Sequence, residues 1–376
     1  MPIALVTNYL PPYRIPLYRL LYERYGVEVY CFGGEPHYVP DSLRDLDRQL
    51  AEAPFPAHRL AHERDARSLA RENDAVIAAI AGRVALPAAY RGARREKTPF
   101  ILWASLWRHP LTLPHTFSLY LMRRIYRRAD AVVTYGAHIS RYVARNRRGD
   151  HGIFVAPQAV EPEIFAREVS EEEKSAWRAG INAKAGRRAE TPIVLFVGRL
   201  VRDKGVEVLL RAWRTLGRSD VTLCLVGDGP LAERAAAAGG GVVLAGRMER
   251  ERLPVAYAAA SMVVVPSIST RRFLEPWGLV CNEAMYQGTP VIASAAVGAV
   301  PGALIVHSVT GMVVRGGDDA ELAAAIVQLL DDAQLRDRIS RLSRNLVETF
   351  TYEAAADAFG EALAFAGLPH GQVSRS

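Results

Sequence analysis

Short apolar runs alternate with helix-like segments along almost the whole chain, and this alternation restricts the possible folds more than any other feature. Helical patterns such as Leu17–Tyr25 and Leu119–Arg128 separate the runs in the first part. Strands that alternate with helices form parallel sheets with helices on both faces. The strand-like runs of the first part are Ile3–Asn8, Val27–Phe32, Ala75–Ile80, Phe100–Ala104, Ala131–Thr134 and Ile153–Ala156.

A second series of the same kind follows a charged stretch between Glu161 and Glu190. Its strand-like runs are Ile193–Val197, Val221–Val226, Val242–Leu244, Met262–Val265, Pro290–Ala293 and Gly311–Val314. Helices are expected over Asp319–Leu330, Ala333–Glu348 and Tyr352–Phe365. A chain of 376 residues has room for two domains of roughly 150–200 residues. The sequence therefore predicts an α/β protein with two tandem Rossmann-like domains, over 1–165 and 191–350. We expect a connection over 166–190, and a C-terminal helix and tail over 351–376 that pack on the first domain.

Composition excludes several other classes of protein. Half of the residues are hydrophobic and 23% are charged, which is unlike disordered or fibrous chains. Cys31, Cys224 and Cys281 lie far apart, and no Cys/His spacing resembles a zinc site. No stretch has the basic-then-apolar pattern of a leader or the roughly 18–20 apolar residues of a spanning helix. We therefore expect a cytoplasmic protein without a bound metal or cofactor.

Positive charge is concentrated in the first part of the chain. Residues 1–160 contain 23 Lys/Arg against 14 Asp/Glu, whereas the remaining residues contain 24 against 26. Such a surface suits anionic lipid, nucleic acid or an acidic substrate, and a solvated Arg-rich face is an equal alternative. We expect no nucleic-acid partner, because interleaved aromatic residues are missing and Tyr120 and Tyr126 are expected to face the core. The densest cluster comprises Arg123, Arg124, Arg127, Arg128, Arg141, Arg145, Arg147 and Arg148.

A basic loop that begins with a glycine follows the first strand of the second series. Gly198 permits close approach of a ligand to the backbone, and Arg199 and Lys204 bracket the loop before a helix. Two cations together with free helix N–H groups suit a diphosphate. By itself, the loop is equally consistent with a basic surface turn.

Two glutamates near the start of a later helix give a stronger signal. Glu275 precedes a helix expected from about Gly278, and Glu283 lies inside that helix, one turn after Leu279 and Val280. A buried carboxylate needs a hydrogen-bond donor, which ligand hydroxyls would supply; a salt bridge inside the core is the alternative. Backbone N–H groups at the helix start would accept a phosphate. The two carboxylates are therefore expected to bind the hydroxyl-bearing ends of one nucleotide sugar.

Taken together, these motifs resemble the retaining family-4 glycosyltransferases of the GT-B fold. The resemblance is close in the second half of the chain and looser in the first. It implies two domains that face each other across a cleft, with the C-terminal helix crossing back to the first domain. The motifs that carry it are Glu275-x7-Glu283, Gly198-Arg199…Lys204-Gly205, Gly227-Asp-Gly-Pro230 and Gly288-Thr-Pro290.

The resemblance also implies a role for each donor-side residue. Glu275 would contact the donor sugar and Glu283 the ribose, while Arg199 and Lys204 would hold the diphosphate. The loop with Arg247 and Met248 would border the base. The donor-binding set implied in this way is Gly198, Arg199, Lys204, Arg247, Met248, Glu275, Trp277, Gly278, Leu279, Val280 and Glu283.

The first half departs from the motifs of that family. In place of a Gly-Gly loop, the first strand is followed by a segment that Pro11 and Pro12 stiffen. The histidine that many members place after the fourth strand is replaced by Ser105, and His109 follows four residues later. The usual Pro-Asn-Gly-Val-Asp segment reads Pro157-Gln-Ala-Val-Glu161. The acceptor-side residues expected here are Asn8, Tyr13, Arg14, Ser105 and His109.

Two further motifs carry weaker signals. The stretch Gly227-Asp-Gly-Pro-Leu-Ala232 has the glycine spacing of a dinucleotide site, with Glu249 about 20 residues later. It follows the second strand of its series, however, and Pro230 lacks an N–H. Asp45-Leu-Asp47 imitates the Asp-x-Asp metal site of the other glycosyltransferase fold, but no apolar strand precedes it. We therefore expect neither NAD nor a metal ion.

The predicted function is transfer of a sugar from a nucleotide-diphosphate sugar to an acceptor hydroxyl, metal-independent and with retention, in bacterial glycan, glycolipid or glycoside biosynthesis. The expected catalytic residues are Glu275, Arg199, Lys204 and His109. The acceptor is expected to be anionic or lipid-linked, and the basic first domain is expected to contact the inner face of a membrane peripherally. Two alternatives stay open: a nucleotide-sugar epimerase of the same fold, and a non-catalytic protein that binds an anionic surface or nucleic acid.

Overall fold

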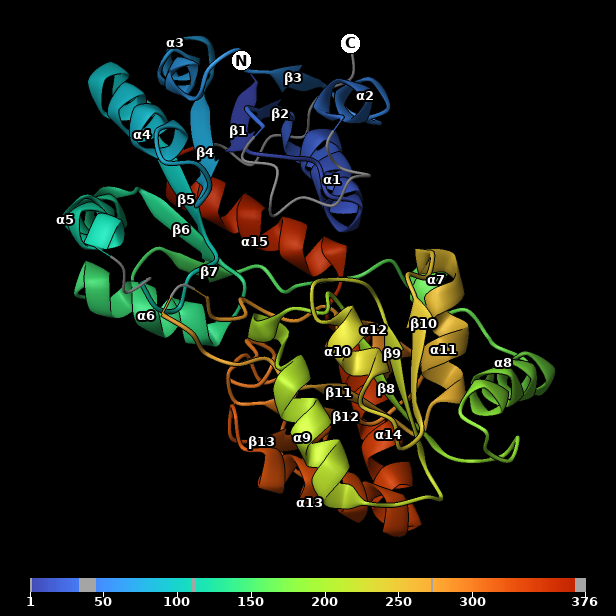
Figure 1. Cartoon of the computed structure of the whole chain (residues 1–376). Helices are drawn as coiled ribbons and strands as arrows, with labels where there is room; N and C mark the ends of the chain where they lie inside the picture. Colours follow the sequence, from blue (N-terminus) through green and yellow to red (C-terminus); the bar gives the residue numbers. More distant parts are fainter. Residues whose placement is uncertain (1, 34–44, 110–112, 272, 369–376) are drawn as a thin grey trace. The chain divides into compact units, whose positions relative to one another are not determined.

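The computed structural model describes residues 2–33, 45–109, 113–271 and 273–368, without the side chains of residues 113–117. The chain divides into two compact units, which are drawn in Figure 1. Unit 1 comprises Met1–Ala159 together with Thr351–Ser376, and unit 2 comprises Val160–Phe350.

A seven-stranded parallel sheet forms the centre of unit 1, in the order β3-β2-β1-β4-β5-β6-β7. The order reverses between β1 and β4, and ligands of open α/β sheets bind at the carboxyl ends of the strands near such a reversal. The strands are β1 Ile3–Thr7, β2 Val27–Cys31, β3 Ala57–Arg59, β4 Ala75–Ala79, β5 Phe100–Ala104, β6 Ala131–Thr134 and β7 Ile153–Val155.

Helices cover both faces of this sheet (Figure 1). One face carries α1 (Ile15–Tyr25), α2 (Leu46–Ala51) and α15 (Tyr352–Phe365). The C-terminal helix packs on the sheet of unit 1 because Ala355, Phe359 and Leu363 are buried at helical spacing. The other face carries α3 Leu69–Glu72, α4 Ala85–Glu96, α5 Leu113–Arg128 and α6 Ala137–Arg147.

Unit 2 is built around a six-stranded parallel sheet in the order β10-β9-β8-β11-β12-β13. One face buries residues of α7, α8, α11 and α12, and the other buries residues of α9, α10, α13 and α14. The strands are β8 Ile193–Val197, β9 Thr222–Val226, β10 Val242–Gly246, β11 Met262–Val265, β12 Val291–Ser294 and β13 Met312–Val314. The helices are α7 Pro162–Phe165, α8 Glu171–Lys184, α9 Val206–Leu216, α10 Ala232–Ala236, α11 Leu253–Ala259, α12 Val280–Tyr286, α13 Asp319–Asp331 and α14 Ala333–Val347.

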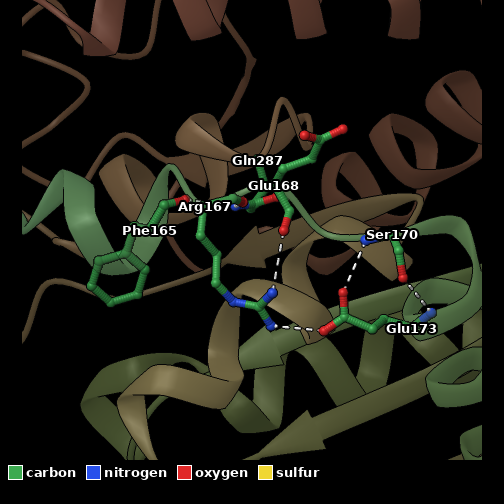
Figure 2. Close-up of polar contacts among 6 residues, drawn as sticks. All are labelled: Phe165, Arg167, Glu168, Ser170, Glu173 and Gln287. Atoms are coloured by element: carbon green, nitrogen blue, oxygen red, sulfur yellow. Dashed lines mark hydrogen bonds and ion pairs between the residues drawn. The ribbon is translucent and has the colours of Figure 1, made fainter.

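The segment 166–190, expected as a connection, is instead part of unit 2. Ser170 and Glu173 form a capping box that starts α8, as Figure 2 shows. The Gln287 side chain donates to the carbonyl oxygens of Phe165 and Arg167 at 2.6 and 2.9 Å. Charged residues dominate this segment because its helix buries only a narrow stripe, so its composition imitates a linker.

The predicted two-domain α/β architecture is confirmed. One strand was not expected, and the expected burial of one side chain is wrong. β3 was not expected, since it is a three-residue edge strand that exposes His58 and Arg59. Tyr126 is buried as expected, but the prediction for Tyr120 is wrong, because 76% of its surface is exposed. Within the described part of the chain, no helix has both the length and the apolar character needed to cross a bilayer.

Candidate functional site

The loops after β8, β9 and β11 meet so closely that glycine is required at two points. A Cβ atom on Gly227 would lie 1.9 Å from the carbonyl oxygen of Gly198, and one on Gly205 would lie 1.9 Å from that of Pro266. Gly205 also has a positive φ of 74°, which favours glycine. These contacts bring the carboxyl ends of three neighbouring strands of unit 2 into one compact cluster of loops.

Lys204 and Glu275, which are 71 positions apart in sequence, form an ion pair in this cluster. Lys204 lies at the end of the short helical turn Arg202–Lys204, and its ammonium also lies 5.9 Å from the Phe273 ring. The Ser267 hydroxyl donates to the same carboxylate oxygen of Glu275 at 3.2 Å. The sequence predicted that Lys204 and Glu275 bind different parts of one ligand; the structure shows that they also contact each other.

The loop that carries Glu275 is fixed by its backbone. Glu275 forms an isolated parallel bridge with Val297, and the Gly298 N–H donates to the Glu275 carbonyl at 3.1 Å. Only 7% of Glu275 is exposed. An ionised carboxylate at this depth requires hydrogen-bond donors, and Lys204 and Ser267 supply them.

Glu283, in α12, accepts a hydrogen bond of 2.5 Å from the hydroxyl of Tyr257 in α11. Burial raises the pKa of Glu283, while the Tyr257 hydrogen bond and the nearby Arg250 act in the opposite direction. A tyrosine hydroxyl of the protein thus donates to this carboxylate, whereas the sequence suggested ligand hydroxyls or, as the alternative, a salt bridge. Tyr257 is fully buried, so its hydroxyl is held in place by the core.

Arg250 and Glu161 form a bidentate ion pair next to this carboxylate, with N–O distances of 2.7 and 2.6 Å. The guanidinium of Arg250 also lies over the Phe165 ring at 5.4 Å. Sequence reasoning missed the roles of Arg250, Tyr257 and Ser267. A polar residue two positions after β11 was a usable signal for Ser267, but the helix patterns around the other two gave none.

The remaining donor-side residues differ in exposure. Arg199 and Arg247 are exposed, and Arg199 has no side-chain hydrogen bond or ion pair to the described residues. Met248 packs at the edge of the core of unit 2. Trp277 has a buried side chain whose Nε1 donates to Asn282 at 2.8 Å. The indole ring of Trp277 therefore lies in the core, and the expected donor contact of this residue stays a prediction.

Gly278, Leu279 and Val280 form the turn that leads into α12, and all three are partly exposed. The helix begins at Val280, two residues later than expected. The Glu283 N–H donates to the Leu279 carbonyl at 3.0 Å, which places Glu283 one turn into the helix as the spacing predicted.

The expected acceptor-side residues lie after the strands of unit 1. Asn8 follows β1 and accepts the N–H of Tyr9 at 3.1 Å. The Tyr13 carbonyl accepts the hydroxyl of Tyr352 at 2.9 Å. Arg14 is buried next to Trp103, Tyr135 and Gln158. Ser105 contacts Tyr135, and the Nε2 of His109 lies 3.4 Å from the hydroxyl of Ser118.

The two weaker motifs have structural roles in the described residues. Gly227 and Gly229 pack against the backbone of Gly198 and Leu200. Asp45 caps α2 by accepting the N–H of Arg48 at 3.0 Å, and Asp47 pairs with Arg59. No group of three or more His, Cys, Asp or Glu side chains is arranged to hold a metal ion in the part of the chain that is described.

The part of the chain that carries Lys204, Glu275 and Glu283 matches the sequence profile of a known protein family. The profile of the family "Glycosyl transferases group 1" matches residues 178–346. A D-inositol 3-phosphate glycosyltransferase of Streptomyces avermitilis is 34% identical over 217 residues, 53% of this chain and 45% of the relative. An alpha-D-kanosaminyltransferase of Streptomyces kanamyceticus is 34% identical over 177 residues, 45% of this chain and 44% of the relative. The chain spans about half the length of the curated relatives it matches.

Solved structures resemble the chain over nearly its whole length. Anabaena HepE, crystallised with UDP, matches with a TM-score of 0.77 at 20% identity, over 97% of this chain and 100% of that one. A glycosyltransferase of Rickettsia africae matches with a TM-score of 0.74 at 16% identity, over 97% and 98%. At these identities the likeness concerns the fold alone. Residues 178–346 thus match the glycosyl transferases group 1, within a chain of two Rossmann-like domains that has the GT-B fold.

Proposed function

We propose that the protein is a glycosyltransferase that moves a sugar from a nucleoside-diphosphate sugar to an acceptor hydroxyl. The observation that carries this proposal is the cluster around Glu275. A buried carboxylate, an ammonium and a hydroxyl meet where β8 and β11 end, inside the region that matches the family profile. Carboxylates bind sugar hydroxyls, and ammonium groups bind phosphates, so the cluster combines the two functions that a donor requires.

In this proposal the donor replaces the contact between Lys204 and Glu275. The ammonium of Lys204 moves to the diphosphate, and the carboxylate of Glu275 accepts hydroxyls of the sugar instead. Arg199 is exposed at the same loop and adds a second cation for the diphosphate. Glu283 accepts the ribose hydroxyls, and Tyr257 orients it through the hydrogen bond of 2.5 Å.

The proposed reaction proceeds with retention and without a metal ion. The bond between the sugar C1 and the β-phosphate oxygen breaks, and the acceptor oxygen bonds to C1 on the same face. The proton of the acceptor hydroxyl goes to the departing diphosphate. Arg199 and Lys204 stabilise the negative charge that develops on the leaving group, which is the contribution that a divalent cation makes in other enzymes.

A thermal-shift panel of UDP, GDP, ADP and dTDP tests the donor assignment. UDP is the first candidate because HepE, of the same fold, was crystallised with UDP and with UDP-glucose. A nucleotide present at about 100 times its dissociation constant stabilises the folded protein by about 2.7 kcal/mol. Stabilisation by one nucleotide, lost in Lys204→Ala, is expected; no stabilisation by any of the four would contradict the proposal.

Turnover separates a transferase from an epimerase of the same fold. A transferase releases free nucleoside diphosphate only when an acceptor is added to the matching donor, whereas an epimerase changes the sugar without releasing it. The assay therefore measures nucleoside diphosphate with and without a lipid or glycan extract. Conversion of the donor sugar in the absence of any acceptor would favour the epimerase.

We further propose that unit 1 meets an anionic or lipid-linked acceptor at a basic face on α5 and α6, at the inner face of a membrane. These two helices pack against each other in unit 1. Arg147 does not contribute, because its guanidinium donates to the carbonyl oxygens of Tyr126 and Ala129 at 2.8 and 2.9 Å. The exposed members of this face, called the α5–α6 patch, are Tyr120, Arg123, Arg124, Arg127, Arg128, Arg141, Arg145 and Arg148.

A further inference from the structure

One guanidinium of unit 1 is buried without a carboxylate beside it. Arg14 is only 8% exposed, and an arginine side chain stays charged in proteins. Among the described residues, its one side-chain hydrogen bond joins its Nη2 to the Oε1 of Gln158 at 2.9 Å, and no ion pair accompanies it. Buried charges are normally paired, because removing a charge from water is costly. The charge of Arg14 therefore needs another explanation.

Aromatic rings surround this charge and partly compensate for its lost hydration. The guanidinium carbon lies 4.4 Å from the centre of the Trp103 ring, 4.8 Å from that of Tyr135 and 5.4 Å from that of Tyr13. Ring faces attract a cation, but they accept no conventional hydrogen bond from its five N–H donors. The Nε1 of Trp103 is also buried without a partner among the described residues. Trp103 thus holds a buried N–H group that the described residues leave unsatisfied, next to a guanidinium that makes one side-chain hydrogen bond to them.

The rings that hold the guanidinium are themselves fixed by the core. Trp103 packs edge-on against Tyr18 at 6.2 Å and Phe359 at 5.2 Å between ring centres. Tyr135 packs against Trp103 at 5.9 Å. Arg14 is therefore held rigidly, as a residue that recognises a ligand should be.

The position of Arg14 is where a parallel sheet binds ligands. Arg14 follows β1, Trp103 lies in β5, Tyr135 follows β6 and Gln158 follows β7, so four strands deliver these residues to one edge. Arg14 is also the N-cap of α1, a helix with no acidic residue in its first turn. The positive end of this helix dipole therefore adds to the charge of Arg14 instead of offsetting it.

We propose that Arg14 binds an anionic oxygen group of the acceptor, either a phosphate or a carboxylate. Both groups match the planar fork of a guanidinium, and either would satisfy its remaining N–H donors. This inference rests on the proposed function only in assigning the anion to the acceptor. Binding of an anion at Arg14 itself is measured without turnover. A purely structural role is the competing explanation, since an arginine stem also fills space in a core.

The experiment reads binding at Trp103 itself. The full chain is labelled with 5-fluorotryptophan, and the ¹⁹F resonance of Trp103 is assigned by its loss in Trp103→Phe. Inorganic phosphate and acetate are titrated separately, so that the two kinds of anion are distinguished. The same titrations are made with Arg14→Lys and Arg14→Met, and with Arg19→Met as a control on the exposed side of α1.

We expect a saturable shift of the Trp103 resonance with at least one of the two anions. Arg14→Lys should weaken this binding roughly tenfold to a hundredfold, because it loses the fork but keeps a charge. Arg14→Met should abolish it and melt at the same or a higher temperature, because a buried charge is replaced by an apolar chain. Arg19→Met should bind the anion like the wild type.

Three outcomes would overturn the proposal. The first is a Trp103 resonance that neither anion shifts in the wild-type chain. The second is an unchanged Trp103 response to the anion in Arg14→Lys. This variant keeps the proposal testable if Arg14→Met does not fold. The third is a clearly lower melting temperature of Arg14→Met, which would assign Arg14 to the core. Failure of the donor assignment appears separately, as absence of nucleotide binding with an intact Trp103 response.

Discussion

The carboxyl edges of the two sheets carry opposite charges at their buried positions. In unit 2, the buried Glu275 and the partly buried Glu283 each accept a hydrogen bond from a donor in a neighbouring element. In unit 1, Arg14 is a buried cation enclosed by aromatic rings. Two sheets that share the order of six strands thus present opposite charges at equivalent edges. Unit 2 suits hydroxyl groups beside a phosphate, and unit 1 suits an anion.

The difference concerns how each edge is stabilised before a ligand arrives. Glu275 has an internal cation, Lys204, so its charge is balanced in the structure. Arg14 has no internal anion among the described residues. If this comparison is correct, variants in unit 2 should couple to one another, whereas the Arg14 site should respond to added anions.

The largest effect is expected for Lys204→Ala. This change removes a phosphate contact and also leaves Glu275 buried without its cation, so activity should fall a hundredfold or more. The double variant Lys204→Ala/Glu275→Gln should be more stable than Lys204→Ala alone, because the unpaired charge is gone. This coupling is measured by kinetics and thermal melts of the wild type, the two single variants Lys204→Ala and Glu275→Gln, and the double variant. The exposed Lys184→Ala serves as control. Strictly additive melting temperatures would show that the ion pair has no energetic role.

Charge reversal of the α5–α6 patch tests the basic face of unit 1. Each basic residue near an anionic membrane contributes about 1 kcal/mol, so reversing Arg123, Arg124, Arg127 and Arg128 to Glu should abolish co-sedimentation with anionic vesicles at low salt. High salt should weaken binding of the wild type. Nucleotide affinity, measured by calorimetry, should not change. The control reverses four exposed arginines elsewhere in unit 1, which are Arg64, Arg67, Arg83 and Arg91. Equal loss of vesicle binding in both variants would show that the net charge of unit 1, and not the α5–α6 patch, determines binding.

Arg199→Ala should lower activity without affecting the fold. The side chain is exposed, so its removal opens no cavity, and the melting temperature should stay unchanged. Losing one charge-assisted contact to the diphosphate costs about 1.5–3 kcal/mol, or tenfold to a hundredfold in kcat/KM. The exposed Arg214→Ala on α9 provides the comparison. Normal kinetics of Arg199→Ala would remove this residue from the diphosphate site.

Tyr257→Phe should change the pH dependence of donor binding. Burial already raises the pKa of Glu283, and the lost hydrogen bond would raise it further. A protonated Glu283 is a poorer acceptor for ribose hydroxyls, so nucleotide affinity should begin to fall at a higher pH on acidification than in the wild type. Calorimetric titrations from neutral to acid pH measure this shift, with the exposed Tyr120→Phe as control. Identical profiles would separate Tyr257 from ribose recognition.

The thermal stability of a Glu283 variant tests the raised pKa of this carboxylate independently of ligand binding. A carboxyl group whose pKa is raised by folding stabilises the folded state at low pH, and this contribution is lost as pH rises through the raised pKa. Glu283→Gln should therefore melt at the same or a higher temperature than the wild type at neutral pH, although it loses nucleotide affinity.

The smallest effect is expected from chelation. EDTA should leave the transfer rate unchanged, because two cations are proposed to hold the diphosphate. Asp45→Ala should cost about 1 kcal/mol of stability through the lost cap of α2, without changing kcat. Loss of activity in EDTA, restored by Mn²⁺ or Mg²⁺, would contradict the metal-independent reaction.

Much of the fold and part of the site could be predicted from sequence. The strands of both sheets were placed correctly except β3, because buried parallel strands are continuous apolar runs. Glu275 and Glu283 stood out because a short loop and one helix hold both, so their spacing is local. The segment 166–190 was misplaced because composition reports exposure, whereas membership in a unit depends on the few buried residues of α8.

The periodic part of the molecule, and the motifs that lie within one loop or turn, could thus be predicted from the chain alone. Which distant side chains meet became visible only in the folded protein. Lys204 pairs with Glu275 across 71 positions, Tyr257 bonds Glu283 from another helix, and four strand ends enclose Arg14. Periodicity and turn chemistry act over a few residues, so a local stretch of sequence is enough to predict their effects. Charge pairing and burial depend instead on distances that only the folded sheets establish.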